Sequence, residues 1–261
     1  MNNLSEKAER KKWLAVLLSI IMPGLGQAYN GELLKGFCFL IFFAVIPMVI
    51  SLAAMYLPDE YLVLGLAAGQ VAALIVYILT IILAAGKVGK TGKQYTLRPY
   101  NSLYAYTAIW LAALVLMAGI DNYMRHNVVR AYRIVSRMMA PQVLQGDRVI
   151  ADLTAYKKHP LAVGDIVIVV YPDDRSKVLI RRIEGLPGDR ITDKDGKVLV
   201  VPHGSAYILR NSSADTDKSW DSEEFGPVDL RDVVGKVRLI YFSKGVDGVR
   251  WSRIGKVTPF K

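Results

Sequence analysis

The sequence contains one cysteine and three histidines among its 261 residues. The single cysteine, Cys38, cannot form an internal disulfide bond, so cysteine usage does not report the redox compartment. The chain has no zinc pattern, and each histidine stands alone in its segment. We therefore expect no metal and no other cofactor.

Charged residues are scarce in the first 120 positions. Residues 1–120 contain 9 Lys and Arg and 5 Asp and Glu, whereas residues 121–261 contain 24 and 18. This change predicts a membrane region, 1–120, followed by a domain, 121–261, that is long enough to bury its own core. The net charge of +10 would also suit a nucleic-acid-binding protein, but no helix-turn-helix, zinc or RNA-recognition pattern accompanies it. We expect the lipid bilayer, and no nucleic acid, as a partner.

Four apolar segments fill the first part of the chain. Residues 36–57 and 61–85 are long enough to cross a bilayer, which takes about 20 residues, and residues 103–120 are near the lower limit. The first segment, 13–28, contains Pro23-Gly24-Leu25-Gly26-Gln27. That composition suits a broken or re-entrant segment whose exposed backbone needs cover from other parts of the protein.

Lysine and arginine indicate which side of the membrane is cytoplasmic. They cluster at 7–12 and again at 87–98, whereas the connection 58–60 has none. Because basic residues favour the cytoplasm, both clusters belong inside, and two spans lie between them. The fourth segment then crosses outward and places the second part of the chain on the extracytoplasmic side. If the first segment were a full span, that part would lie inside and the first basic cluster outside.

The second part of the chain changes to short, β-branched apolar runs. Pro, Gly and Asp separate these runs, which is typical of strands joined by turns. The clearest runs are 148–151, 165–171, 197–201 and 234–242. They predict a mainly antiparallel β domain.

Two stretches of this domain contain the motifs that indicate its function. Residues 133–141 read Arg-Ile-Val-Ser-Arg-Met-Met-Ala-Pro, and residues 180–189 read Ile-Arg-Arg-Ile-Glu-Gly-Leu-Pro-Gly-Asp. They resemble the nucleophile and general-base boxes of bacterial signal peptidase I, a membrane-anchored Ser–Lys protease. Further matches keep the family's order, at 163–167, 211, 221–228, 235–236 and 251–255.

The resemblance covers nearly all of residues 131–261. It implies an α-helical transmembrane N-terminal region followed by a mainly antiparallel β signal-peptidase-like domain. The implied location is the bacterial inner (cytoplasmic) membrane, with several spans and an extracytoplasmic C-terminal domain.

Both reactive side chains of that family are replaced in this sequence. When the boxes are aligned on their glycines and prolines, the nucleophilic serine falls on Met138 and the lysine base on Arg181. Methionine has no hydroxyl, and arginine stays protonated at any working pH, so neither side chain can do the dyad's chemistry. By the resemblance, Ser136 matches a serine whose hydroxyl is similar to an oxyanion-hole donor. Ser136, Met138 and Arg181 should lie close together.

The other box positions have structural roles that need no catalysis. Glycines permit tight turns, and Arg182 with an acidic partner would form an ordinary ion pair. These positions are Pro141, Gly146, Asp147, Arg182, Gly185, Pro187, Gly188, Asp189, Asp221 and Ser222.

No other residue has the spacing needed to replace the missing serine or lysine. Ser136 as nucleophile would shift its loop by two residues. Lys177 precedes Arg181 by four residues, about 13 Å along a strand, which exceeds the hydrogen-bond reach of about 3 Å that a base needs. No histidine lies in a matching box.

The sequence therefore predicts a multi-pass membrane protein that binds an extended signal peptide or a membrane-protein segment without cleaving it. Two alternatives stay open. A divergent but active signal peptidase I would cleave signal peptides from secreted preproteins, and a membrane scaffold would retain the domain as a vestige. A cleavage assay separates the enzyme from the other two, and peptide crosslinking separates a binder from a scaffold.

Overall fold

The computed structural model describes residues 7–91, 95–192, 196–212 and 220–257 of the chain. The chain divides into two compact units, residues 1–57 with 64–123 and residues 58–63 with 124–261.

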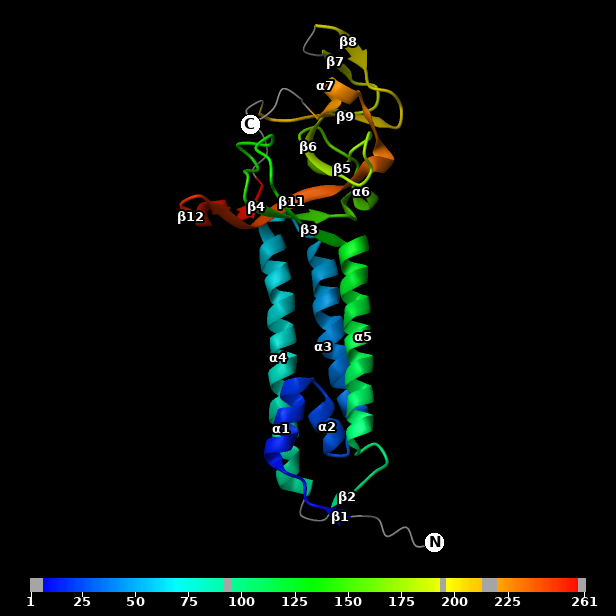
Figure 1. The fold of residues 1–261 in the computed structure, drawn as a ribbon, viewed down its shortest axis with the longest axis vertical. Coiled ribbons are helices and arrows are strands. Elements are labelled where there is room, and N and C mark those ends of the chain that lie inside the picture. The colour runs from blue at the N-terminus through cyan, green and yellow to red at the C-terminus, as the bar shows by residue number, and fades with distance from the viewer. Residues whose placement is uncertain (1–6, 92–94, 193–195, 213–219, 258–261) are drawn as a thin grey trace. The chain divides into compact units, whose positions relative to one another are not determined.

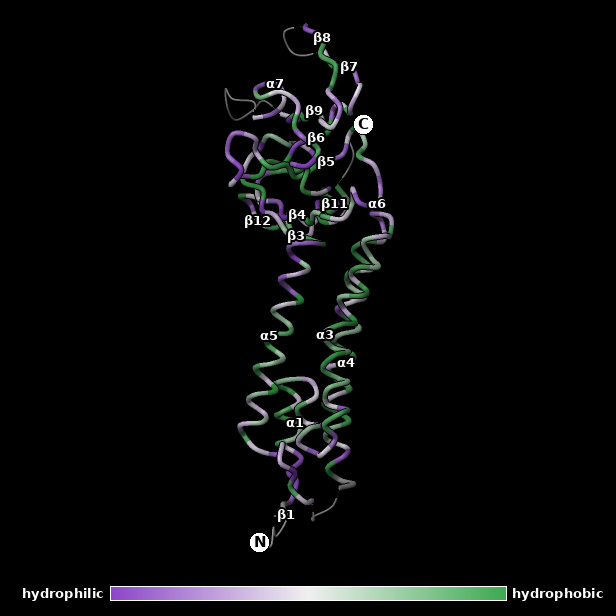
Figure 2. The backbone as a smooth tube through the Cα atoms, turned by 90° about the vertical axis from the view of Figure 1, so that its right-hand side faces the viewer, coloured by the Kyte–Doolittle hydropathy of each residue, from purple (hydrophilic) through white to green (hydrophobic). Residues whose placement is uncertain are grey.

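Five α-helices lie in the described part of the first 127 residues (Figure 1). They are α1 (Lys12–Ile21), α2 (Leu25–Tyr29), α3 (Leu33–Ala54), α4 (Asp59–Thr91) and α5 (Leu103–Asn127). Three of them, α3, α4 and α5, are long and apolar enough to cross a membrane, and their apolar composition is evident in Figure 2. The expected α-helical N-terminal region, with long apolar helices, is confirmed. Both α4 and α5 are longer than the apolar runs that predicted them, because polar residues extend each helix.

The first apolar segment is divided between α1 and α2. The chain turns at Gly24, whose φ of +98° lies in the left-handed region that favours glycine. Behind the turn, the Gln27 amide donates to the Thr80 carbonyl at 2.7 Å and the Asn30 amide donates to the Ala84 carbonyl at 2.8 Å. Both acceptors belong to α4. The break therefore packs against protein, as polar groups within a membrane region require.

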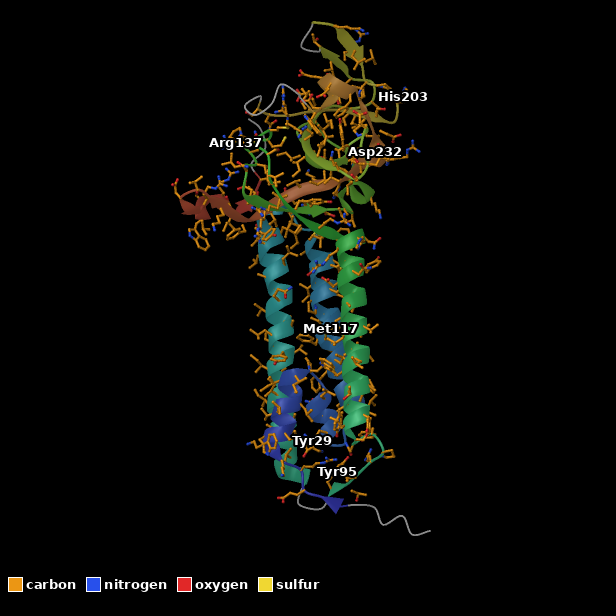
Figure 3. The ribbon with its side chains drawn as sticks, in the orientation of Figure 1. Tyr29, Tyr95, Met117, Arg137, His203 and Asp232 are labelled. Carbon is orange, nitrogen blue, oxygen red and sulfur yellow. The ribbon has the colours of Figure 1, made fainter. Side chains whose placement is uncertain are left out.

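Arg10 joins the start of the chain to this helical hairpin. Its guanidinium carbon lies 4.3 Å from the ring centre of Tyr29 and 4.0 Å from that of Tyr95, two residues labelled in Figure 3. Arg10 is only 8% exposed. Cation–π contacts with the two rings stabilise a charge that burial would otherwise disfavour. The two-residue strands β1 (Lys7–Ala8) and β2 (Tyr95–Thr96) pair antiparallel beside it.

The second unit is built on a nine-stranded sheet in which every described pairing is antiparallel. Its main order is β10-β9-β6-β5-β11-β4-β3, and β12 and β13 also pair with β11. The strands are β3 (Val129–Arg133), β4 (Asp147–Asp152), β5 (Ile166–Val170), β6 (Val178–Gly185), β9 (Ser205–Leu209), β10 (Val228–Asp229), β11 (Val233–Gly245), β12 (Gly248–Val249) and β13 (Gly255–Lys256). A separate hairpin contains β7 (Arg190–Thr192) and β8 (Val198–Val200). The expected antiparallel β domain is confirmed.

Short helical turns connect several of these strands. They are α6 (Ala155–Lys158), α7 (Ser222–Phe225), η1 (Leu230–Asp232) and η2 (Trp251–Arg253).

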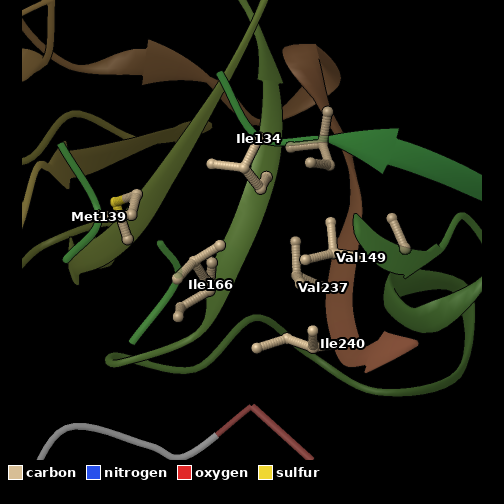
Figure 4. Close-up of a cluster of buried hydrophobic side chains, with 9 residues drawn as sticks. Ile134, Met139, Val149, Ile166, Val237 and Ile240 are labelled. Atoms are coloured by element: carbon tan, nitrogen blue, oxygen red, sulfur yellow. The ribbon is translucent and has the colours of Figure 1, made fainter. Parts of the chain in front are cut away.

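Two apolar clusters cover opposite faces of β5. Ile166 and Ile168 belong to the cluster drawn in Figure 4, and Val167 and Val169 belong to the other. Successive side chains of a strand point to opposite faces, so a strand buried on both sides needs an unbroken apolar run. Burying each such side chain stabilises the folded domain by about 2 kcal/mol. Because β5 contributes side chains to both clusters, it lies at the centre of the apolar core.

Candidate functional site

The loop between β3 and β4 contains the first motif. We call residues 135–145 the motif loop. Ile134 closes its base, because the Ile134 N–H donates to the Asp147 carbonyl and the Gly146 N–H donates to the Ile134 carbonyl, both at 2.9 Å. Met139 anchors its centre, with a side chain buried in the core cluster of Figure 4. Backbone hydrogen bonds and apolar burial thus hold the motif loop in place.

The backbone of Met138 is held by the segment that follows β9. Its carbonyl accepts hydrogen bonds from the N–H groups of Asn211 at 2.8 Å and Ser212 at 3.0 Å. The Asn211 side chain also donates to Gln142 of the motif loop at 2.6 Å. These bonds explain why an asparagine stands at this position.

Arg181 projects from β6 to Met138. Its Nη2 lies 3.1 Å from the Met138 sulfur. Its Nε donates to the Trp220 carbonyl at 2.9 Å, and its Nη1 donates to the Ile180 carbonyl at 2.6 Å. The structure therefore brings together two side chains that are 43 positions apart in the chain.

The Arg181 guanidinium is a buried cation, with 2% of the residue exposed. Desolvation lowers the pKa of Arg181 to about 10, against the opposing effect of the nearby Asp221 carboxylate. At pH 7 the side chain still lies about three pH units below that pKa. The neutral fraction is then about one in a thousand, so Arg181 is a poor proton acceptor.

Ser136 lies in the same loop, two residues before Met138, and is half-buried. Its neighbours Val135 and Arg137 are exposed. Among the described residues, none forms a hydrogen bond with the Ser136 hydroxyl. The hydroxyl is therefore available for a bound group.

Asp147 is a buried carboxylate at the end of the motif loop. Arg253 Nη2 lies 2.8 Å from its Oδ2, and Arg250 Nη2 lies 3.4 Å from its Oδ1. The Ser243 hydroxyl donates at 2.6 Å and the Leu144 N–H at 2.8 Å. Burial raises the pKa of Asp147, but these donors outweigh burial and lower the pKa below its usual value. The carboxylate therefore stays ionised at neutral pH and holds the loop to the end of the sheet.

Gly146 and Pro141 shape the same loop. Gly146 has a φ of +90°, and a Cβ there would collide with the Lys244 carbonyl oxygen. The Pro141 carbonyl accepts from Arg253 Nη1 at 3.3 Å. Both residues thus contribute to the shape of the motif loop.

Arg182 and Gly185 stabilise the end of β6. Arg182 forms an ion pair with Glu184, with 2.7 Å between Nη2 and Oε2. A Cβ on Gly185 would lie 2.8 Å from the Ile191 side chain. The glycine therefore allows β7 to approach closely.

The turn after β6 is closed by a carboxylate. Asp189 Oδ2 accepts from the Leu186 N–H at 2.8 Å, and Pro187 and Gly188 lie between them. Gly188 has a φ of +92°. The Gly-Leu-Pro-Gly-Asp motif is therefore a turn closed by its own aspartate, and backbone hydrogen bonds from Gly188 and to Asp189 also join it to Val201.

Asp221 and Ser222 connect α7 to β9. Asp221 caps the helix by accepting from the Glu223 N–H at 3.1 Å, and it also accepts from the Arg210 N–H at 3.2 Å. The Ser222 hydroxyl accepts from the Ile208 N–H at 2.9 Å. These bonds position the segment whose Trp220 carbonyl binds Arg181.

The substitute catalytic residues lie elsewhere. Lys177 forms an ion pair with Asp174 at 2.9 Å in the turn before β6. The three histidines lie in α5, after α6 and before β9, at His126, His159 and His203 (the last labelled in Figure 3).

Two contributors to the site were absent from the sequence prediction. Trp220 presents its carbonyl to Arg181 from an unusual positive φ of 51°. Arg253 binds the Asp147 carboxylate from 106 positions away. Arg253 lies within the matched 251–255 stretch, but spacing along a chain does not reveal a partner so distant.

A family model described as "Signal peptidase, peptidase S26" matches residues 107–206. The matched region contains both Met138 and Arg181.

Several characterised proteins are similar to this chain. Mitochondrial ATP-independent inner membrane protease subunit 1a of Arabidopsis thaliana is 34% identical over 134 residues, which cover 48% of this chain and 76% of the relative. Probable signal peptidase I-1 of Synechocystis sp. is 24% identical over 189 residues, 61% of this chain and 91% of the relative. Signal peptidase I of Bacillus caldolyticus is 24% identical over 169 residues, 51% and 88%.

Proposed function

Because this chain belongs to the signal peptidase family, peptidase S26, we propose that it is a membrane-anchored member that binds an extended peptide without cleaving it. One observation carries the proposal. The positions that align with the family's serine and lysine are occupied by Met138 and Arg181, whose side chains lie 3.1 Å apart.

The chemistry of these two side chains argues against peptide hydrolysis. A Ser–Lys mechanism needs a hydroxyl that attacks the carbonyl carbon and an amine that accepts the hydroxyl proton. The Met138 thioether has no proton to give. Arg181 is protonated at pH 7 even after burial has lowered its pKa to about 10. In the motif alignment the pair takes the two positions of the dyad, but it lacks both functions.

Peptide binding needs only backbone groups, and β6 offers them. Residues Val178–Arg182 pair with β5 on one side, whereas β9 pairs only with the later residues Arg182–Gly185 on the other. On that second side, no described strand pairs with Val178–Ile180. An extended peptide can pair with such an edge as an added strand. Arg181 is the next residue of β6 after this edge, and its side chain contacts Met138.

The proposal includes a topology. The three apolar helices α3, α4 and α5 support an odd number of crossings. The basic residues at 7–12 and 87–98 favour the cytoplasm. Residues 124–261 would then face the extracytoplasmic side of a bacterial inner membrane, where the peptide would be a signal peptide or a membrane-protein segment.

A peptide-cleavage assay tests the absence of catalysis. Purified wild-type protein and the Ser136→Ala variant are compared on a preprotein in detergent or liposomes. We expect no turnover from either. Wild-type turnover that disappears in Ser136→Ala would identify Ser136 as a nucleophile and support an active, divergent peptidase instead.

Site-specific photocrosslinking tests peptide binding. A photoreactive residue is placed at Val178, on the β6 edge, and in a control protein at Val198, an exposed valine of β8. We expect an added signal peptide to crosslink at position 178 and not at 198. Equal labelling at both positions, or none at either, would favour the scaffold alternative.

A further inference from the structure

A basic groove lies beside the motif loop, within the second unit. Its volume is about 520 Å³. Thirteen residues line it, of which four are basic and none is acidic. The four are Arg133, Arg137, Lys244 and Arg250; Figure 3 labels Arg137.

The local carboxylate, Asp147, neutralises only part of this charge, through its ion pair with Arg250. Asp147 lies behind the groove and is fully buried. It already binds two arginines, Arg250 and Arg253. For Arg133 and Lys244, no carboxylate of a described residue lies within ion-pair distance. The groove therefore has a net positive charge that an anion would complement.

The rim of the groove is apolar and exposed. Val135 of the motif loop is 72% exposed, and Val246, at the turn between β11 and β12, is fully exposed. Trp251 follows Arg250 in the chain and is 74% exposed. Basic side chains flanked by exposed valine and tryptophan are typical of surfaces that meet the boundary between lipid headgroups and acyl chains.

A short stretch of chain connects the groove to the end of α5. Arg133 follows Asn127, the last residue of α5, by six positions. A chain of six residues reaches about 20 Å at most. Because α5 is long and apolar enough to cross a bilayer, Arg133 cannot lie far from the headgroups that surround the end of that span.

We propose that this groove binds the phosphate of an anionic phospholipid headgroup. Arg133 and Lys244 would contact the phosphate oxygens, and Val135 and Val246 would contact the adjoining lipid. An acidic peptide has the matching charge but gains nothing from the apolar rim, so the lipid is the favoured ligand. This proposal does not depend on whether the domain cleaves peptides.

Native mass spectrometry of the full-length protein in a neutral detergent tests the proposal. Phosphatidylglycerol is the anionic probe, and phosphatidylcholine with the same acyl chains is the zwitterionic control. Arg133→Glu combined with Lys244→Glu reverses the two available charges of the groove. Arg175→Glu combined with Arg190→Glu makes the same change in net charge at residues that do not line the groove.

We expect the wild type to prefer phosphatidylglycerol over phosphatidylcholine. A basic residue near anionic lipid contributes about fivefold in affinity, so losing two attractive charges should weaken phosphatidylglycerol binding by about 25-fold, and the two introduced carboxylates should weaken it further. The control pair should change it less than about twofold. Melting temperatures close to wild type in both variants establish that the fold is intact.

Three results would overturn the proposal. The first is equal phosphatidylglycerol binding by the groove variant and the control variant. The second is displacement of the lipid by inorganic phosphate, which would make free phosphate the ligand. The third is charge-dependent binding of a glutamate-rich peptide to the groove without any preference for phosphatidylglycerol.

Discussion

The sulfur of Met138 lies 3.1 Å from Nη2 of Arg181, with the Trp220 carbonyl on Nε of the same guanidinium. A thioether is a weak hydrogen-bond acceptor, so it compensates little for the removal of a cation from water. The contact is therefore explained better by the position that each residue occupies in the fold than by the strength of the bond. That position makes the pair a direct target for restoring the dyad.

Restoring the dyad should require both changes at once. Met138→Ser alone places a hydroxyl beside a permanent cation that cannot accept its proton, and Arg181→Lys alone provides a base with nothing to activate. Residues of such a unit act non-additively. A general base contributes about 100- to 10,000-fold, and we expect the double variant to exceed either single variant by about 100-fold.

The gain in cleavage rate should lie at the lower end of the roughly 100- to 10,000-fold range, because the new lysine must also be neutral near pH 7. Burial lowers the pKa of a lysine, but the site is built around a longer, planar cation. A peptide-cleavage assay compares the four proteins, with Met138→Ala combined with Arg181→Met as the inactive control. Full activity in a single variant would contradict the assignment of the pair.

Gly146 and Gly188 form a matched pair for testing backbone strain. Both have positive φ, +90° and +92°. A Cβ at Gly146 would collide with the Lys244 carbonyl oxygen. A Cβ at Gly188 would point into space that no nearby part of the described chain fills to within 4 Å. Gly188→Ala should cost only the left-handed backbone penalty, about 1 kcal/mol. Gly146→Ala should cost about 3 kcal/mol or more, because the Lys244 backbone must also move.

Thermal unfolding in detergent, followed by tryptophan fluorescence, measures both glycine variants. The difference in destabilisation between the two variants measures the cost of the collision apart from the cost of the left-handed backbone. Equal destabilisation would mean that the motif loop relaxes freely around position 146.

Asp147→Asn should destabilise the protein and remove part of its acid sensitivity. The pKa of Asp147 is lowered in the folded state. Its stabilising contribution is therefore complete above the unfolded pKa of about 4 and is lost as pH falls through the lower folded pKa. Removing one partner of a buried ion pair costs about 3 kcal/mol, so we expect a loss of that size at pH 7 that shrinks below about pH 4.

Asp174→Asn is the control for Asp147→Asn. Its hydrogen bonds to Ser176 and Lys177 lower the pKa of Asp174 to about 2, but the group is exposed. Surface substitutions of this kind usually change stability little. A comparable loss in both variants would show that the buried network around Asp147 is not the source of the effect.

The proposed topology predicts the behaviour of reporters fused after Lys261. Alkaline phosphatase, which is active outside the cytoplasm, should be active there, and a green fluorescent protein that requires the cytoplasm should be dark. A control fusion truncated after Lys93, between the second and third long helices, should give the opposite pattern. A fluorescent C-terminal fusion would place the domain inside and make the first apolar segment a full span.

Local pattern was sufficient to predict the membrane helices and part of the sheet. Long apolar runs predicted α3, α4 and α5, because hydropathy over about 20 residues depends only on neighbours in the chain. Short β-branched runs predicted β4, β5, β8 and β11 within a few residues. Strand β6 was not among the clearest apolar runs, because Arg181, Arg182 and Glu184 interrupt its pattern.

What the sequence by itself determined is the class of the fold and the presence of methionine at position 138 and arginine at position 181, where the family's boxes have serine and lysine. The tertiary structure decided which residues meet. Arg181 is buried because the segment at Trp220 and the motif loop both contact it. Asp147 binds Arg253, which lies 106 positions away in the chain. The positive groove also forms only when β3, the motif loop and β11 come together. Charge, burial and hydrogen bonding between distant segments depend on three-dimensional proximity, which local sequence patterns do not contain.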